Sequence, residues 1–243
     1  MTARSAILAD LSARIRQLER ARVRSVRDVT VSSSPAVGLN RLLPDVMSLR
    51  GGLIEWLSDM KGAGGTSLAV LASQSAIENE LWVFVDGQQQ LHAAGFASLS
   101  LDLRRMVLVK PERPTDVLWA VEQALRTRGV GAVVCEVDRL SQAAFRRLQL
   151  AAETGGSLGI LLRPERVRHQ PSWAEYRLLV RPLATAGPPS ASHPRRRLLV
   201  EVLRGRKGFT TESVIVELDD ADGRVCLAAE LASATTAVRA TGA

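Results

Sequence analysis

The chain has 243 residues, of which 46% are apolar and 23% are charged, a composition typical of a globular domain rather than of a disordered or fibrous chain. No segment approaches the roughly 20 consecutive apolar residues of a membrane span, and the charged N-terminus lacks the apolar core of a secretory signal. We therefore expect a cytoplasmic protein without membrane contact. The two cysteines and three histidines have neither the spacing of a metal site nor that of a disulfide framework.

The formal net charge of +7 is unevenly distributed. Arginines are concentrated in residues 1–28 and 163–207, whereas the last 36 residues are acidic. This asymmetry suggests contact with a polyanion or with an acidic protein surface, although a solvated basic face explains it equally well. Aromatic residues make up 4% of the chain, fewer than a single-strand-binding protein built on base stacking usually has.

The N-terminal region is predicted to form a helical arm. Within residues 5–24, aliphatic side chains recur at helical spacing and form one narrow apolar stripe, which consists of Ile7, Leu11, Ile15 and Leu18. The other faces of this helix are rich in arginine, and a polar stretch follows it. We assign residues 1–35 to an arm and linker, whose stripe binds either the chain's own core or a partner.

Residues 36–228 are predicted to form an α/β core. Short apolar runs alternate with helical patterns, as in a parallel sheet covered by helices on both faces. The runs lie at 53–57, 81–86, 106–110, 130–137 and 157–163. After Pro164 the pattern changes to strands at 176–183 and 195–206 and to a strand, a DADG turn and a short strand within 213–225, which predicts an antiparallel extension of the sheet. Residues 229–243 are small and polar, and we assign them to a flexible tail.

The helices between the apolar runs are predicted from their caps and from helix-breaking residues. One helix extends from Thr66 to about Ile77. A second follows Pro111 and Pro114, which end the third apolar run, and is capped by Thr115 with Asp116. A third is capped by Ser141.

The stretch LSDMKGAGGTSLAVLA, residues 57–72, has the outline of a phosphate-binding loop between a strand and a helix. With Thr66 at the last position of G-x-x-x-x-G-K-[ST], Gly64 fits the second glycine, but Gly65 stands where the lysine belongs. The loss of such a charge-assisted contact costs on the order of 1.5–3 kcal/mol. We therefore predict a vestigial loop, formed by Gly62, Gly64, Gly65 and Thr66, which holds no cofactor; a plain glycine turn is the structural explanation.

Two further positions of an ATPase site can be recognised. The run VVCEVD, residues 133–138, places Glu136 at the end of a strand, as in the acid that helps to hold magnesium. The run WVFVDGQQQL, residues 82–91, places Gln88 where recombinase-type ATPases carry a water-activating glutamate. Glutamine orients a water molecule but cannot accept its proton. We therefore interpret the chain as a pseudo-ATPase without catalytic residues and without a bound metal.

Four segments together carry a resemblance to a known family: GLNRLLP at 38–44, LDLRRMVLVKPERPTDVLWAVEQAL at 101–125, RRLQLAAETGGSLGILLRP at 146–164 and RRRLLVEVLRGRKG at 195–208. They resemble ImuA, a RecA-like accessory protein of bacterial mutagenic translesion DNA synthesis, and the resemblance extends over about residues 36–225. It implies a RecA-like core and a non-enzymatic part in the SOS response to DNA damage. The implied partners are RecA, an ImuB-type polymerase-like protein and an error-prone replicative-type polymerase.

Two surfaces are candidates for these partners. The stripe of the N-terminal arm is expected to dock on a RecA-like surface, either RecA or a second copy of this chain. The second surface is a basic run, Arg195, Arg197, Arg204, Arg206 and Lys207, which meets DNA phosphates or an acidic patch of the ImuB-type partner. A solvated edge strand whose charges discourage aggregation is the alternative. DNA is contacted directly or through partners, and Arg163 stands where recombinases keep a polar switch residue.

Two other functions remain open from the sequence. A weak nucleotide-dependent switch would use the glycine loop and Glu136. A cell-division inhibitor of the SulA type would share the RecA-like ancestry. The additional β region and the basic run favour the adaptor over this second function.

Overall fold

A computed structural model describes residue 43, residues 46–59, 62, 64–74, 77, 79–92, 94–99, 101–184, 195–205, 213–219 and 225–227. The predicted arm, the tail and part of the basic run lie outside the described residues; they include Ile7, Leu11, Ile15, Leu18, Arg206 and Lys207. The assignments made for them therefore stay predictions.

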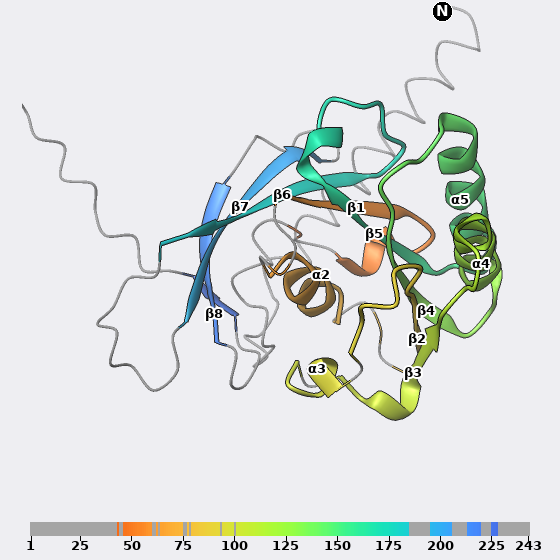
Figure 1. The fold of residues 1–243 in the computed structure, drawn as a ribbon, viewed down its shortest axis with the longest axis horizontal. Helices are drawn as coiled ribbons and strands as arrows, with labels where there is room; N and C mark the ends of the chain where they lie inside the picture. Colours follow the sequence, from red (N-terminus) through yellow and green to blue (C-terminus); the bar gives the residue numbers. More distant parts are fainter. Residues whose placement is uncertain are drawn as a thin grey trace, which may run out of the picture. The chain divides into compact units, whose positions relative to one another are not determined.

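Within the described residues, nine strands form one mixed sheet in the order β3-β2-β4-β5-β1-β6-β7-β8-β9 (Figure 1). The strands are β1 (Leu53–Ser58), β2 (Leu81–Val85), β3 (Met106–Val109), β4 (Val130–Glu136), β5 (Leu158–Pro164), β6 (Tyr176–Leu183), β7 (Arg196–Arg204), β8 (Ser213–Leu218) and β9 (Val225–Leu227). All pairings from β3 to β6 are parallel, and those from β6 to β9 are antiparallel. The predicted α/β class and the mostly parallel sheet are thus confirmed. The predicted antiparallel extension is confirmed from the β6–β7 pair onward, whereas β6 itself joins the sheet by pairing with β1 in parallel.

Helices cover both faces of the parallel part of the sheet (Figure 1). They are α2 (Gly65–Ser73), α3 (Ala94–Ala97), α4 (Pro114–Arg126) and α5 (Gln142–Gly155), with short 3-10 turns η3 (Val46–Leu49), η5 (Leu103–Arg105) and η6 (Glu165–Val167). Helix α2 packs in a cluster with one face of the sheet, whereas α4 and α5 pack in a second cluster with the other face. This two-sided cover explains why the central strands are almost continuously apolar.

The helix ends follow local chemistry. The hydroxyl of Ser141 accepts a hydrogen bond from the backbone N–H of Ala144, which confirms the predicted cap of α5. The predicted cap of α4 by Thr115 and Asp116 is wrong, because this helix already begins at Pro114. Proline is favoured at a first helical position, where its missing N–H has no intrahelical partner to lose.

Helix α2 is buried on nearly all sides, which its almost uniformly apolar sequence requires. Its residue Leu68 shares one buried cluster with Ile54 of β1 and Ile160 of β5, and also with Leu198 of β7 and Val216 of β8. The antiparallel extension therefore contributes to the same core as the parallel strands, and α2 is packed into that core. This placement fixes the glycine loop at the start of α2. In the part of the chain that the structure describes, no helix is both long and apolar enough to cross a membrane.

Candidate functional site

The carboxyl ends of the parallel strands bring the predicted ATPase-type positions to one edge of the sheet. The glycine loop leaves β1 toward α2, Gln88 follows β2, and Glu136 ends β4 before the turn to α5. Because α2 and α5 pack on opposite faces, the chain changes face between these strands. Ligands of open α/β sheets bind at the carboxyl edge where such a change occurs, so this edge is the candidate site.

The glycine loop is packed against strand β7. Gly64 precedes α2 with φ of 90°, a conformation that glycine adopts far more readily than other residues. It is buried, and a Cβ atom added to it would lie 2.9 Å from Cδ1 of Leu198. Arg196 of the same strand donates a hydrogen bond from Nη1 to the carbonyl oxygen of Gly62 at 3.3 Å. Backbone conformation and close packing thus require glycine here without any phosphate.

Gly64 is followed by Gly65, the position at which a phosphate-binding loop has its lysine. Gly65 is the first residue of α2 and is buried, but its φ is not in the left-handed region. A Cβ added to it would meet only Cβ of Ser58, at an ordinary contact distance of 3.6 Å. The backbone therefore does not demand glycine at this position, in contrast to Gly64. Thr66 follows as a half-buried residue in the first turn of the helix.

Gln88 and Glu136 contact each other across the site. The amide Nε2 of Gln88 donates a hydrogen bond to Oε1 of Glu136 at 3.0 Å, and both side chains are exposed. The turn that carries Gln88 is organised by Asp86, whose carboxylate accepts hydrogen bonds from the backbone N–H groups of Gln90 and Leu91 at 3.1 and 2.8 Å. The pair consists of one carboxylate and one neutral amide, so it contains a single group that can accept a proton.

Cys135 precedes Glu136 in β4, and its thiol is buried. Burial, with smaller contributions from the charges of Glu136 and Asp86, raises the pKa of its thiol from 9.0 to about 12. A thiol with this pKa stays protonated at neutral pH and is therefore a poor nucleophile. Among the described residues, no group of three or more histidine, cysteine, aspartate or glutamate side chains is arranged to hold a metal ion.

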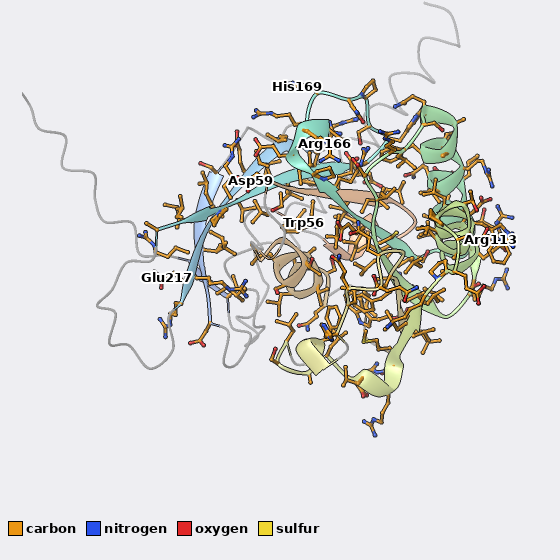
Figure 2. The ribbon with its side chains drawn as sticks, in the orientation of Figure 1. Trp56, Asp59, Arg113, Arg166, His169 and Glu217 are labelled. Atoms are coloured by element: carbon orange, nitrogen blue, oxygen red, sulfur yellow. The ribbon has the colours of Figure 1, made fainter. Side chains whose placement is uncertain are left out.

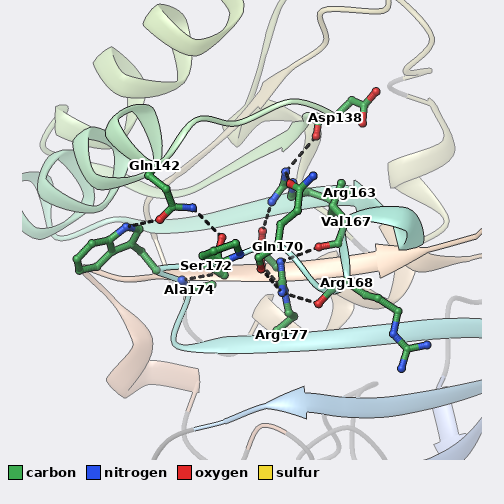
Figure 3. Close-up of polar contacts among 12 residues, drawn as sticks. Asp138, Gln142, Arg163, Val167, Arg168, Gln170, Ser172, Ala174 and Arg177 are labelled. Carbon is green, nitrogen blue, oxygen red and sulfur yellow. Dashed lines mark hydrogen bonds and ion pairs between the residues drawn. The ribbon is translucent and has the colours of Figure 1, made fainter.

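Asp138, the acid that follows β4, contacts the segment after β5 at the same edge of the sheet (Figure 3). Its carboxylate forms an ion pair with Arg166 of η6, and its carbonyl oxygen accepts a hydrogen bond from Nη2 of Arg163 at 3.0 Å. Figure 2 shows Arg166 and His169 on the segment between β5 and β6. Asp138 therefore joins the turn after β4 to the turn after β5.

Arg163 belongs to a buried charge cluster that the sequence analysis did not recognise. Its Nη1 lies 2.6 Å from Oε1 of Glu55, and Nε of Arg177 lies 2.6 Å from Oε2 of the same carboxylate. Glu55 is fully buried in β1, between β5 and β6, which carry the two arginines. The second positive charge is shared with carbonyl oxygens of the segment that joins β5 to β6, namely those of Val167, Arg168 and Gln170, which accept hydrogen bonds from Arg177 (Figure 3).

The side chain of Arg163 is therefore a structural partner of Glu55 and is not exposed at a surface where it could act as a switch. The signal was visible in the sequence: the apolar strand β1 contains one glutamate, and its neighbours β5 and β6 contain one and two arginines, respectively. The register of the sheet brings Glu55 opposite Arg177 and within reach of Arg163. The order of the strands, which local sequence pattern does not predict, is needed to recognise that these opposite charges pair with one another.

The basic run is divided between two places. Arg195 lies 3.4 Å from a carboxylate oxygen of Asp219, and Arg197 lies 3.7 Å from one of Glu217. Arg204 is at the other end of β7, where its Nη1 donates a hydrogen bond to the carbonyl oxygen of Ser172 at 2.5 Å. Arg196 points to the opposite side, toward the glycine loop, as the alternation along a strand predicts. Arg195 and Arg197 thus have acidic neighbours on the sheet itself.

The chain is 31% identical over 138 residues to Protein ImuA of Caulobacter vibrioides, in each of two strains, which covers 51% of this chain and 55% of that protein. These findings support an ImuA-family relationship. The matched part spans little more than half the length of the curated ImuA proteins. The chain is also 30% identical over 105 residues to Cell division inhibitor SulA of Klebsiella aerogenes, over 43% of this chain and 62% of that protein. No family model matches the chain.

Proposed function

We propose that the chain is a RecA-like adaptor of the mutagenic DNA damage response, which acts in translesion synthesis by binding other proteins rather than by hydrolysing ATP. The observation that carries this proposal is the similarity to ImuA. The doubly covered sheet, in which β5 lies between β1 and β4, supports a RecA-like core. The proposed partners are RecA, an ImuB-type polymerase-like protein and an error-prone polymerase, with DNA contacted directly or through them.

The glycine loop supports the non-enzymatic part of the proposal. A triphosphate needs an ammonium group at the position that Gly65 occupies, and the neighbouring turn is packed against Leu198 and bonded to Arg196. The position at which recombinase-type ATPases carry the water-activating base is occupied by Gln88, which cannot accept a proton, and the carboxylate of the pair belongs to Glu136, at the position of the magnesium-binding acid. A titration with a fluorescent ATP analogue and magnesium tests this point. Saturable binding at micromolar concentration that is lost in Glu136→Gln would instead establish a nucleotide-dependent switch.

The experiment that tests the adaptor function combines genetics with purification. Deletion of the gene should lower the frequency of damage-induced mutations, and the tagged full chain, purified from damaged cells, should carry along the ImuB-type protein and RecA. Unchanged mutation frequency in the deletion strain would refute the proposal. Purification without either partner would refute the proposed contacts.

A second function is favoured by one specific observation, the similarity to a cell division inhibitor. Overproduction of the chain separates the two functions. Filamentous cells with a normal frequency of damage-induced mutation would establish division inhibition, whereas cells of normal length with altered mutation frequency would support the adaptor.

A further inference from the structure

The outer face of helices α4 and α5 carries two exposed apolar side chains. The two helices pack against each other on one face of the sheet (Figure 1). Trp119 of α4 is 62% exposed, although Val121 and Leu125 of the same helix are buried against the sheet. On α5, Leu150 is 44% exposed between buried neighbours. Both residues therefore lie on the side of their helix that faces away from the sheet.

A buried carboxylate orders two arginines on the same pair of helices. Glu122 of α4 has a side chain that is only 9% exposed. It accepts a hydrogen bond from Nη2 of Arg126 at 2.8 Å, one turn further along α4, and another from Nη2 of Arg147, which crosses from α5. The side chains of Arg126 and Arg147 nevertheless remain 51% and 64% exposed. The negative charge is hidden while two positive charges are presented to solvent, so the group has an excess of one positive charge.

This arrangement has the properties of a prepared binding surface. Tryptophan and arginine are the residues that most often dominate the binding energy of protein interfaces. The guanidinium groups are already held in place by Glu122, so less side-chain entropy is lost when a ligand binds them. Each guanidinium has donors beyond those used by Glu122 and can bind a further carboxylate. Trp119 is 62% exposed, so covering it removes more apolar surface from water than covering any other large apolar side chain among the described residues.

We propose that this α4–α5 face, formed by Trp119, Arg126, Arg147 and Leu150, binds an acidic segment of a protein partner that also carries an apolar side chain. A carboxylate of the partner binds at the two arginines, and its apolar side chain covers Trp119 or Leu150. The inference deepens the proposed function, on which it rests for the expectation of a protein partner. The excess of a single positive charge and the flanking apolar residues favour an acidic peptide over nucleic acid, whose backbone requires several cations along its path.

The test uses the purified full chain as bait for a display library of random peptides. The expected result is enrichment of peptides in which aspartate or glutamate lies near leucine, isoleucine or phenylalanine. Labelled peptides from this selection should bind at least about tenfold more weakly to Trp119→Ala and to Arg147→Ala, as expected when a dominant contact is removed. Leu103→Ala is the matched control, because Leu103 is also an exposed apolar residue but lies on η5, outside helices α4 and α5, and this variant should bind as the unchanged chain does.

Selection of peptides without acidic residues, or of peptides that bind Trp119→Ala and Leu103→Ala equally well, would overturn the proposal. Failure to select any peptide that depends on Trp119 would do the same. Binding of a single-stranded oligonucleotide that is lost in Trp119→Ala would assign the surface to nucleic acid instead. Failure of the proposed function is distinguishable: deletion of the gene would then leave damage-induced mutation unchanged, while the dependence of peptide binding on Trp119 would stand. Circular dichroism and thermal unfolding of each variant confirm that the substitutions act at the surface.

Discussion

Leu198 of β7 packs directly against Gly64, the residue that precedes helix α2. The glycine that corresponds to the second glycine of a phosphate-binding loop is therefore in contact with the core of the antiparallel extension. The next residue, Gly65, has no such neighbour, since a Cβ there would meet only Ser58 at 3.6 Å. The two adjacent glycines thus differ in what the fold requires of them.

The first prediction follows from this difference. Gly64→Ala should lower the free energy of unfolding by about 1–3 kcal/mol, because alanine is strained at positive φ and its Cβ would press on Leu198. Gly65→Ala should leave it unchanged or raise it by about 1 kcal/mol, because alanine is favoured over glycine in a helix. Urea unfolding of the two variants measures both effects. Equal destabilisation by both substitutions would contradict the structural account of the loop.

The sequence predicted the parts of the fold that depend on local pattern. The strands, the antiparallel pairing of β7 to β9 and the cap at Ser141 follow from apolar runs and from side-chain chemistry within a few residues, but the parallel pairing of β6 with β1 does not. The start of α4 was displaced because Pro114, one of the two prolines taken to end the preceding strand, instead opens the helix. The predicted helix from Thr66 to about Ile77 ends at Ser73 in the structure.

The site depended on contacts between distant segments, which periodicity cannot supply. The degenerate loop was recognisable from the glycines and the absent lysine, but not its packing against Leu198, which is 134 residues from Gly64 in sequence. The hydrogen bond of Gln88 to Glu136 and the two arginines on Glu55 likewise require the order of the strands. The sequence contained these residues, whereas their pairing came from the topology.

The buried cluster around Glu55 leads to the second prediction. Glu55→Gln should lower the free energy of unfolding by about 3–5 kcal/mol, because Arg163 and Arg177 would remain buried without a counter-charge. Glu217→Gln is the control: it removes an acid from a partly exposed pair with Arg197 and should cost no more than about 1 kcal/mol. Denaturant unfolding of both variants measures the difference. Similar costs for the two substitutions would show that the buried cluster does not hold the sheet together.

The third prediction concerns the thiol of Cys135. In a Cys226→Ser background, iodoacetamide at about pH 8 should modify Cys135 at least about 10³-fold more slowly than in urea, because a buried thiol reacts only when the chain unfolds. The raised pKa also has a consequence for stability. Between pH 9 and about 12 the unfolded thiol ionises and the folded one does not, so this group favours unfolding increasingly as the pH rises through that range. Rapid labelling of the folded chain would contradict the buried position of Cys135.

The last prediction uses the ion pairs of Glu165, which connect η6 to β6. A hydrogen bond from Arg181, with further attraction from Arg181 and Arg168, lowers the pKa of Glu165 below its usual 4.5. A carboxyl whose pKa is lower in the folded state stabilises the fold above the unfolded pKa, and this contribution disappears as the pH falls through the folded pKa. Glu165→Gln should therefore reduce the stability at neutral pH by at most about 1 kcal/mol and should flatten the loss of stability below pH 4.5.

Unfolding by urea at a series of pH values measures this effect. Glu153→Gln provides the comparison, because Glu153 is 48% exposed and lies 3.8 Å from Arg146, a pair that solvent screens well. If the pH profile of Glu165→Gln runs parallel to that of the unchanged chain, the ion pairs with Arg181 and Arg168 do not contribute to the folded state in solution. A flatter acid limb in Glu165→Gln alone would instead show that the segment after β5, which also carries the partners of Arg177, is held to β6 by charge.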